Sequence, residues 1–539
     1  MFLFTQAQYP LKITYKFLYW LYSQSWTIYS GSSPVYFNCS KGNFNFNFSN
    51  KAVKSKASLM ETQKQITLTL LFLTFSLYFL TILPRLLSYG MFFDGVTYAS
   101  IARNLAEGFG SFWQPYYTET VYPEFYEHPP LGLFLQSLAF KIAGDSLRVE
   151  AFYGFFASLV VLSTIWLIWR LEKNINENQA GGWVPVLMCV FIPMTSYLFS
   201  NNFLEGTLTV FTTLAALFAI CSLLSTKRII FVTLSIFSGI MIFCAVLVKG
   251  PVGLFPLAIP FIWYLTRDHK NISRPIITTL LMLLGILGIS YILILSNDDF
   301  LISMKRYYSR QVVASLSGNR DKSSDHFGII MVTFREVIVP FLVGIVVWTI
   351  FRIKKHRLSI KPGNVTLFYF LIALSGSLPI AISPKQLMWY VYPSFPFFAL
   401  AIASMFNAPF KHIEDVLANT LKSRLTIVSV GSLIFIGSIV WMFAENGMVR
   451  KEKEFHKDFS LQVVHIPSRQ IISVYPPNLK SNWPLVANMQ RSFRASLTDS
   501  LGCKYLLTTI DQKNHVDSLG TYKAIHPPDL SRYLLYIHN

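Results

Sequence analysis

The chain has 539 residues, of which 53% are hydrophobic and only 14% are charged, whereas soluble proteins average about 25% charged residues. This composition excludes an ordinary soluble domain, because the apolar surface exceeds what such a domain can bury. The net charge of +19 comes mainly from Lys and Arg in short segments between apolar runs. These residues form no basic stripe, which argues against a nucleic-acid partner.

The first 59 residues differ from the rest of the chain. They are rich in Phe, Tyr, Asn and Ser and lack the charged-then-apolar order of a signal peptide. Met60 stands just before the first strong apolar run, so we interpret 1–59 as a doubtful leader and expect translation to start at Met60. The uncharged run from Ile66 to Leu83 is long enough to cross a hydrocarbon core of ~30 Å as a helix.

Ten more apolar runs of about 15 to 22 residues follow. They start near residues 151, 182, 206, 229, 250, 275, 337, 365, 386 and 425. Backbone groups in lipid must be hydrogen-bonded within their own segment, so each run predicts a helix. The expected fold is therefore an α-helical polytopic membrane protein with about eleven transmembrane helices.

The basic residues of the short connections predict the orientation of the chain. Six groups fall on one face, which we expect to be cytoplasmic together with the N-terminus. These groups are Lys64; Arg170 and Lys173; Lys227 and Arg228; Arg267, Lys270 and Arg274; Arg352, Lys354, Lys355 and Arg357; and Lys411, Lys422 and Arg424. The long connection 90–149, which is rich in acids, then faces outward, and so does the tail.

The tail from about residue 445 contains alternating stretches such as "RQIISVY" and "KYLLTTI" and the helical stretch "NMQRSFRASL". These patterns predict a small α/β domain outside the membrane. We accordingly divide the chain into the leader 1–59, a transmembrane domain 60–444 and an extracytoplasmic domain 445–539.

Asp94 opens the first outer connection in "MFFDGVTYASIARNLAEGFG", directly after the first membrane helix. The residues that follow have helical spacing, with Tyr98, Ile101 and Leu105 on one face. Asp is a favoured residue before a helix, so Asp94 is either a solvated cap or a general base held at the bilayer surface. Both interpretations remain open from spacing alone.

The same connection continues as "YEHPPLGLFLQSLAFKIAG", in which two prolines fix the backbone where Glu127 and His128 meet the membrane. His128 can bind a phosphate or simply cap the turn.

Four motifs in this order resemble one known family. They are "FFDGVTYASIARNLAEG" followed by "HPPLGLFLQSLAFKIAGDS" and Arg148, then "NNFLEGTLTVFTTLAALFA", "VLVKGPVGLFPL" and "SPKQLMWYVYPSFPFFALAIA". The combination resembles the polyprenyl-phosphate-sugar glycosyltransferases of the GT-C class, within them the protein mannosyltransferases and the aminoarabinose (lipid A) transferases. The resemblance covers about residues 66 to 405.

The resemblance implies an inverting glycosyltransferase of GT-C fold. Such an enzyme moves a hexosyl or pentosyl group from undecaprenyl or dolichyl phosphate to a lipid, glycan or protein acceptor at the outer face. Asp94 matches the family's catalytic acid, which takes or orients the acceptor proton. Glu205 matches a second acidic position that orients the acceptor or the sugar, a role we also give to Tyr98 and Glu127. An acid near a helix N-terminus is also favoured by the helix dipole alone.

The cations expected to bind the donor phosphate lie at outer membrane boundaries. Lys249 and Lys385 can neutralise the leaving phosphate, although snorkelling is the structural alternative. Arg310 belongs to an outer connection that is unusually basic. His128 stands where relatives often place Lys, and histidine is fully charged only at low pH, so phosphate binding is expected to depend more on Lys249, Lys385 and Arg310.

No cofactor is required by these motifs. The sequence contains no Asp-x-Asp motif, His-rich cluster or paired-cysteine spacing, so we assign no metal ligand, although a divalent ion is not excluded. The expected location is a bacterial inner membrane. A transporter or flippase for a lipid-linked glycan is the alternative, but such proteins usually place ionisable residues near the bilayer midplane and often have repeated halves. Here the apolar runs carry almost no charge.

Overall fold

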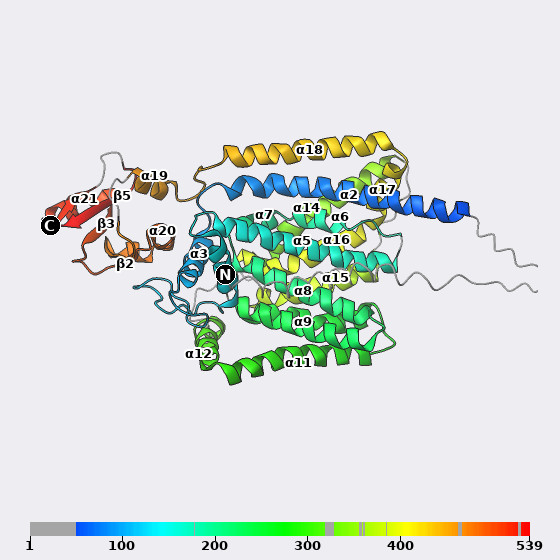
Figure 1. Cartoon of the computed structure of the whole chain (residues 1–539), viewed down its shortest axis with the longest axis horizontal. Helices are drawn as coiled ribbons and strands as arrows, with labels where there is room; N and C mark the ends of the chain where they lie inside the picture. Colours follow the sequence, from blue (N-terminus) through cyan, green and yellow to red (C-terminus); the bar gives the residue numbers. More distant parts are fainter. Residues whose placement is uncertain are drawn as a thin grey trace, which may run out of the picture.

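The computed structural model describes residues 50–176, 178–317, 328–354, 358, 360, 362–383, 385–461, 466–525 and 530–539. Long helices lie side by side in a bundle, and a small α/β domain lies at one end of it (Figure 1). Residues 1–49 lie outside the described residues, so the leader and the start at Met60 stay predictions.

Nine helical segments among the described residues are long and apolar enough to cross a membrane, or ten with one bent pair. The nine comprise α2 (Asn50–Leu86), α5 (Val149–Ile175), α8 (Leu204–Leu224), the segment of α9 (Arg228–Lys249), η1 (Gly250–Ala258) and α10 (Ile259–Thr266), α11 (Ser273–Ser296), α14 (Gly328–Ile353), α15 (Asn364–Ile382), the segment of η3 (Met388–Ser394) and α16 (Phe395–Met405), and α18 (Leu421–Ala444). The bent pair is α6 (Trp183–Val190) and α7 (Pro193–Ser200), which meet at 73°.

The difference from about eleven predicted helices arises in the segment α9–η1–α10, which is helical throughout but reverses direction. A Cβ on Gly253 would lie 2.7 Å from the carbonyl carbon of Ala245, so η1 runs back along α9. Lys249 at the turn pairs with Glu205, whereas Arg267 beyond α10 pairs with Glu172 at the other end of the bundle. The runs predicted from residues 229 and 250 are thus the two legs of one hairpin.

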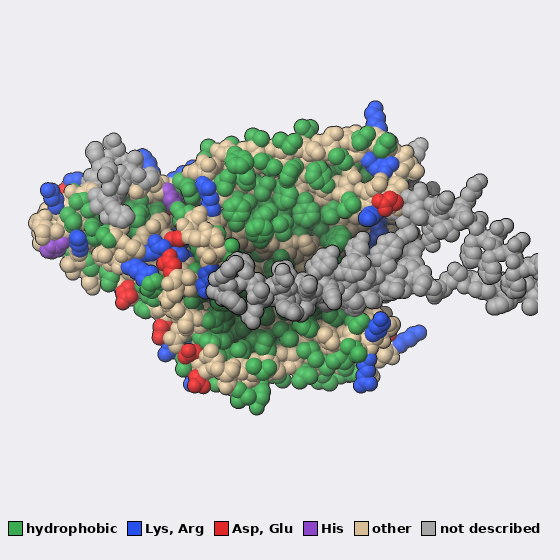
Figure 2. All heavy atoms as spheres, in the orientation of Figure 1, with side chains coloured by type: hydrophobic (Ala, Val, Ile, Leu, Met, Phe, Trp, Pro, Cys, Tyr) green, Lys and Arg blue, Asp and Glu red, His purple; other side chains and the backbone are tan. Residues whose placement is uncertain are grey.

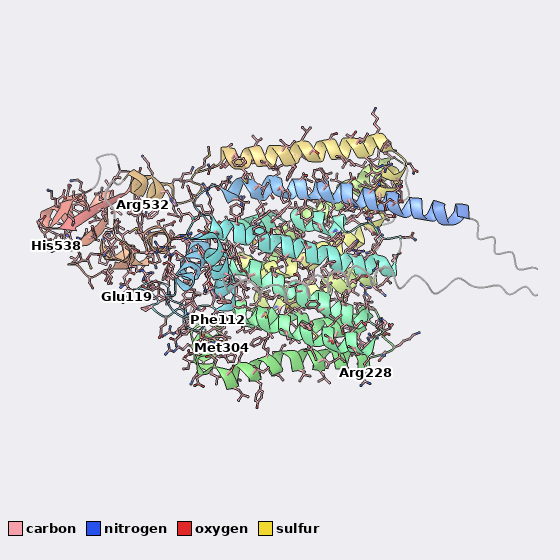
Figure 3. The ribbon with its side chains drawn as sticks, in the orientation of Figure 1. Phe112, Glu119, Arg228, Met304, Arg532 and His538 are labelled. Atoms are coloured by element: carbon pink, nitrogen blue, oxygen red, sulfur yellow. The ribbon has the colours of Figure 1, made fainter. Side chains whose placement is uncertain are left out.

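We call the end of the bundle that carries the α/β domain the site end. Figure 1 shows short helices there between the bundle and the domain. The connections that follow α2 and α11 contain the short elements α3 (Phe93–Ala106), α4 (Leu131–Ala143), α12 (Asp298–Tyr307), η2 (Tyr308–Val313) and α13 (Ala314–Leu316). The opposite end carries α17 (Asn407–Ala418) and the connection before α9. Figure 3 labels Phe112, Glu119 and Met304 at the site end and Arg228 at the opposite end.

Apolar side chains cover the middle of the bundle surface, as expected for a face that meets lipid (Figure 2). The largest buried cluster lies inside the bundle and includes Trp169, Phe199 and Tyr392, each fully buried. Both the surface and the interior are therefore apolar between the two ends, which confirms the predicted polytopic helical fold.

The C-terminal part is a small α/β domain, as predicted. Its sheet has the order β2-β1-β3-β5-β4, in which β1 is parallel to β2 and β3, and β5 is antiparallel to β3 and β4. Its elements are α19 (Lys453–Leu461), β1 (Ile471–Tyr475), η4 (Pro477–Ser481), α20 (Trp483–Phe493), β2 (Ser496–Thr498), β3 (Tyr505–Thr509), η5 (Ile510–Gln512), α21 (Lys513–Ser518), β4 (Tyr522–Ala524) and β5 (Tyr533–His538).

The α/β domain docks on the first connection through buried charged groups. Arg103 of α3, only 1% exposed, donates to the carbonyl oxygen of Arg491 at 2.8 Å. The Arg491 guanidinium pairs with Asp145 at 2.8 Å and with the buried Glu150 at 3.1 Å. These contacts join α20 to the same helix that begins at Asp94.

Candidate active site

Asp94 lies in the first turn of α3, whose start is fixed by the chain just before α8. The Phe92 N–H donates to Asn201 Oδ1 at 2.7 Å, and Asn202 Nδ2 donates to the carbonyl oxygen of Gly95 at 3.0 Å. A Cβ on Gly95 would collide with the Asn201 carbonyl oxygen. Glycine at this position therefore permits the close approach that places Asp94.

The Asp94 carboxylate is half-buried, and within the described ranges it forms no hydrogen bond or ion pair with another side chain. Burial raises the pKa of Asp94 above its usual range, while the nearby charges of Lys249 and Lys385 oppose that rise. The result is a carboxylate with increased basicity whose oxygens are not occupied by a protein donor.

Glu205 and Lys249 form a buried ion pair at the site end. Glu205 lies in the first turn of α8 and is 0% exposed, and Lys249 is the last residue of α9 and is 8% exposed. The Lys249 ammonium donates to Glu205 Oε1 and lies 4.7 Å from the centre of the Tyr390 ring. Glu205 Oε2 has no hydrogen-bond partner among the described residues, so this oxygen remains able to accept from a ligand.

The turn after Lys249 depends on Gly250, whose φ is +74°. A Cβ there would collide with the hydroxyl of Tyr307. Only glycine combines this left-handed backbone with such close contact, which explains why Gly follows Lys in the hairpin that presents the ammonium.

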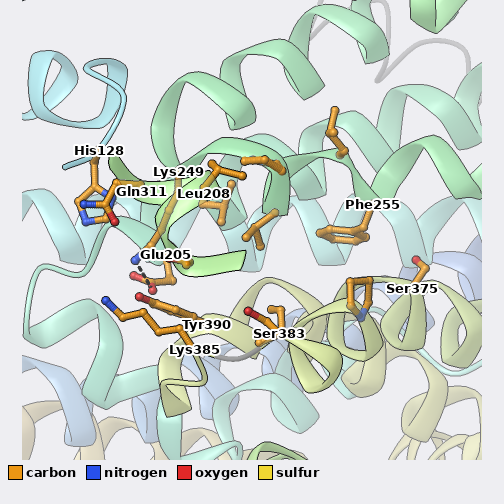
Figure 4. A pocket seen from close by; sticks show the side chains of 18 of the residues that line it. His128, Glu205, Leu208, Lys249, Phe255, Gln311, Ser375, Ser383, Lys385 and Tyr390 are labelled. Atoms are coloured by element: carbon orange, nitrogen blue, oxygen red, sulfur yellow. Dashed lines mark hydrogen bonds and ion pairs between the residues drawn. The ribbon is translucent and has the colours of Figure 1, made fainter. Parts of the chain in front are cut away.

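Lys385 reaches the same place from the connection between α15 and η3. Figure 4 shows Lys385, Tyr390, Glu205 and Lys249 gathered at one end of a cavity, with the two ammonium groups on the same side. Two cations and a phenol thus surround one buried carboxylate. The two ammonium groups can donate charge-assisted hydrogen bonds to an anion such as a phosphate.

Glu127 and His128 line the cavity from the first connection. The Tyr98 hydroxyl is hydrogen-bonded to His128 Nε2 at 3.0 Å, and Gln311 Nε2 donates to Glu127. Burial raises the pKa of the Tyr98 hydroxyl well above its usual range, with Asp94 and Glu205 adding to the rise. Tyr98 therefore stays a neutral hydrogen-bonding group between the carboxylates and His128.

The cavity has a volume of about 610 Å³. Its charged end is formed by Glu127, His128, Glu205, Lys249 and Lys385. Its other walls come from α8, η1 and α15 and are mostly apolar, including Leu208, Val252, Leu254, Phe255, Leu257, Ala258, Pro379 and Ile380. Figure 4 shows Phe255 and Ser375 far from the charged end. The site can thus hold a polar group and an attached apolar chain together.

The structure brings together most of the residues expected from the sequence. Glu127, His128, Glu205, Lys249 and Lys385 line one cavity. Asp94 and Tyr98 act electrostatically on these residues from its edge.

Arg310 is placed elsewhere. It is exposed, lies 5.7 Å from the centre of the Tyr126 ring and does not line the cavity. Its neighbour Gln311, in the same π-helical segment η2, lines the cavity instead. Gln311 and Tyr390 are among the polar lining residues that the sequence analysis did not assign. Tyr390 could have been predicted from the sequence, because it lies five residues after Lys385 in the motif "SPKQLMWYVYPSFPFFALAIA".

The described residues do not bring together a set of metal-binding side chains. Among the described residues there is no group of three or more His, Cys, Asp or Glu side chains that could hold a metal ion. We therefore assign none of the site residues as a metal ligand.

Comparison with known proteins supports one superfamily. The family model for dolichyl-phosphate-mannose-protein mannosyltransferase matches residues 127–294. The crystal structure of ArnT from Cupriavidus metallidurans bound to undecaprenyl phosphate aligns with a TM-score of 0.56 at 12% identity, over 86% of this chain and 96% of that one. The chain has the fold of the GT-C glycosyltransferases.

The apo structure of the same ArnT aligns equally broadly. Its TM-score is 0.53 at 11% identity, and the alignment covers 90% of this chain and 98% of that one. No curated protein sequence is significantly similar to the chain. The matched family region contains Glu205 and Lys249 but not Asp94.

Proposed function

We propose that this protein of GT-C fold transfers a sugar, with inversion, from a polyprenyl phosphate to an acceptor at the outer face of the membrane. The observation that carries the proposal is the cavity in which Lys249 and Lys385 lie at one end and apolar walls continue into the bundle. Asp94 lies within electrostatic reach of both lysines. The lysines would bind the phosphate, the apolar walls would contact the polyprenyl chain, and Asp94 would interact with the acceptor.

The transfer follows from these positions. Asp94 accepts the proton of the acceptor hydroxyl as its oxygen attacks the anomeric carbon of the sugar. The bond from that carbon to the phosphate oxygen breaks, and the electron pair leaves with the polyprenyl phosphate. Lys385 and Lys249 stabilise the charge that grows on this oxygen. One displacement inverts the anomeric centre and needs no covalent enzyme intermediate, metal or cofactor.

The remaining groups orient the reactants. Glu205 Oε2 can accept a hydrogen bond from a sugar hydroxyl, since its other oxygen is taken by Lys249. Glu127 and Tyr98 extend this polar wall, and His128 adds a donor when protonated. Arg310 is not needed for this arrangement. The related ArnT was crystallised with undecaprenyl phosphate, a ligand of the same chemical class as the donor proposed here.

The apolar part of the cavity supports a lipid-linked donor. Its walls belong to α8, η1 and α15, which all contribute to membrane-spanning segments. A polyprenyl chain would lie along them while its phosphate stays at the charged end. The basic connections at the opposite end of the bundle favour a cytoplasmic location for that end. The site would then face outward, in a bacterial inner membrane, and the acceptor would be a lipid, a glycan or a protein.

Deleting the gene and comparing the masses of surface glycolipids and glycoproteins tests the proposal. We expect one product to lose a single sugar residue, the wild-type gene to restore it and the Asp94→Asn gene to leave it missing. A flippase would instead lose the whole lipid-linked glycan product, and Asp94→Asn would restore it. An unchanged mass profile in the deletion strain would overturn the transferase.

A further inference from the structure

A second pair of cations, Arg85 and Lys451, lies near the chain that leads into α3. Arg85 is in the last turn of α2, and its Nη1 donates to Ser200 Oγ at 2.8 Å. Lys451 lies between α18 and α19, in residues 445–452, which we call the strap. Both side chains are half-buried. Neither takes part in the cavity that holds Lys249 and Lys385.

The strap is fixed against the chain that leads into α3. The Tyr89 N–H donates to the carbonyl oxygen of Met448 at 2.8 Å, and the Arg450 N–H donates to the carbonyl oxygen of Tyr89 at 2.9 Å. Gly90, with a φ of +80°, leaves room for the backbone of Lys451. The position of Lys451 relative to the start of α3 is therefore set by backbone contacts.

Aromatic rings connect these cations with Asp94. The Lys451 ammonium lies 5.1 Å from the centre of the Phe92 ring and 5.3 Å from that of Tyr197. Phe92 directly precedes α3, and Tyr197 lies within electrostatic reach of both Arg85 and Asp94. The rings of Phe92 and Tyr197 thus form an aromatic surface between the two cations and Asp94.

The same surface continues to the donor cavity. The Phe92 ring lies 5.1 Å from the ring of Trp389, which is half-exposed and adjacent in sequence to Tyr390 of the cavity wall. A molecule lying on Phe92 would therefore have Lys451 on one side and the donor sugar on the other.

Neither cation forms an ion pair among the described residues. Glu452, adjacent to Lys451, acts on its charge from a distance, and Glu445 is paired with Arg450 at 3.1 Å. Burial and the charge of Arg85 lower the pKa of Lys451. Arg85 and Lys451 repel each other, and an anion bound between them would stabilise both charges.

We propose that Arg85 and Lys451 bind an anionic group of the acceptor, a phosphate or a carboxylate, and so present its hydroxyl to Asp94. The inference rests on the proposed sugar transfer and specifies the class of acceptor. The rings of Phe92 and Tyr197 would pack against the body of the acceptor next to its charged group.

The test uses the full-length protein in nanodiscs and the unmodified acceptor purified from the deletion strain. We expect this acceptor to carry a phosphate or carboxylate. We also expect its KM to rise about tenfold or more in Lys451→Gln and in Arg85→Gln, because each removes a charge-assisted contact. Lys451→Arg should keep the KM close to the wild-type value. The matched control Lys453→Gln alters an exposed lysine two positions away and should leave the KM unchanged.

Two further measurements separate this proposal from its alternatives. The Kd for undecaprenyl phosphate should stay at the wild-type value in Lys451→Gln, because donor binding uses other lysines. The KM change in Lys451→Gln should be the same in nanodiscs without anionic lipid. If the cation bound only bulk lipid headgroups, the KM would change only when anionic lipid is present. A neutral acceptor, an unchanged KM or an effect confined to anionic nanodiscs would overturn the anionic-acceptor site. Loss of sugar transfer in the wild-type protein would overturn the proposed function instead.

Discussion

Breaking the buried pair of Glu205 and Lys249 should cost far more stability than removing it as a unit. In Lys249→Met, Glu205 would remain 0% exposed without its ammonium partner. Leaving one charge of a buried pair uncompensated typically costs about 3–5 kcal/mol. Loss of the contact with the Tyr390 ring, 4.7 Å from the ammonium, adds to the cost. We therefore expect a lower thermal midpoint in detergent.

The double variant Glu205→Gln/Lys249→Met removes both charges together. Replacing a buried pair with neutral groups of similar size is often neutral or stabilising, so its thermal midpoint should return to about the wild-type value. Sugar transfer should nevertheless stay low, because the donor phosphate has lost Lys249. Equal destabilisation in the double variant and in Lys249→Met would refute this reasoning, as would a Lys249→Met protein as stable as wild type.

Three other changes test separate parts of the structure. Burial raises the pKa of Asp94, and two nearby lysines lower it. The rate of transfer should therefore fall as the pH drops through this raised pKa. In Lys385→Met the pKa should rise further, so the fall in rate should occur at a higher pH. Gly376→Leu should weaken binding of long-chain more than short-chain polyprenyl phosphates, measured by competition, because even a Cβ there would lie 3.3 Å from the Phe255 ring in the apolar wall. Arg491→Met leaves a buried carboxylate unpaired, so limited proteolysis should release the α/β domain; equal resistance to protease would contradict this.

The transmembrane helices and the end of the bundle that carries the site residues were predictable because both depend on local composition. Uncharged runs predicted the spans, and charged residues at their ends located Asp94, Glu205, Lys249 and Lys385. The hairpin at Lys249 was predicted as two runs although its backbone stays helical throughout. The apolar runs therefore predicted both legs of this hairpin, although they did not show how the turn between them is built.

Contacts between distant segments were not predictable. The pairing of Glu205 with Lys249 and the contact of Lys249 with Tyr390 join three different helical segments. Which side chain of η2 faces the cavity, Gln311 and not Arg310, also depends on how this segment packs, and no residue pattern indicated it. The sheet order of the α/β domain and its attachment through Arg491 likewise arise from long-range packing. Spacing along the chain carries no direct information on such contacts.

The central claim is tested most directly by adding purified protein to a lipid extract of the deletion strain and measuring product mass over time. Wild-type protein should add one sugar to the acceptor. Asp94→Asn should slow this step by a factor of about 10² or more, as expected for loss of a general base, while binding undecaprenyl phosphate with unchanged Kd. Transfer by Asp94→Asn at the wild-type rate would contradict the assignment of Asp94 as the base.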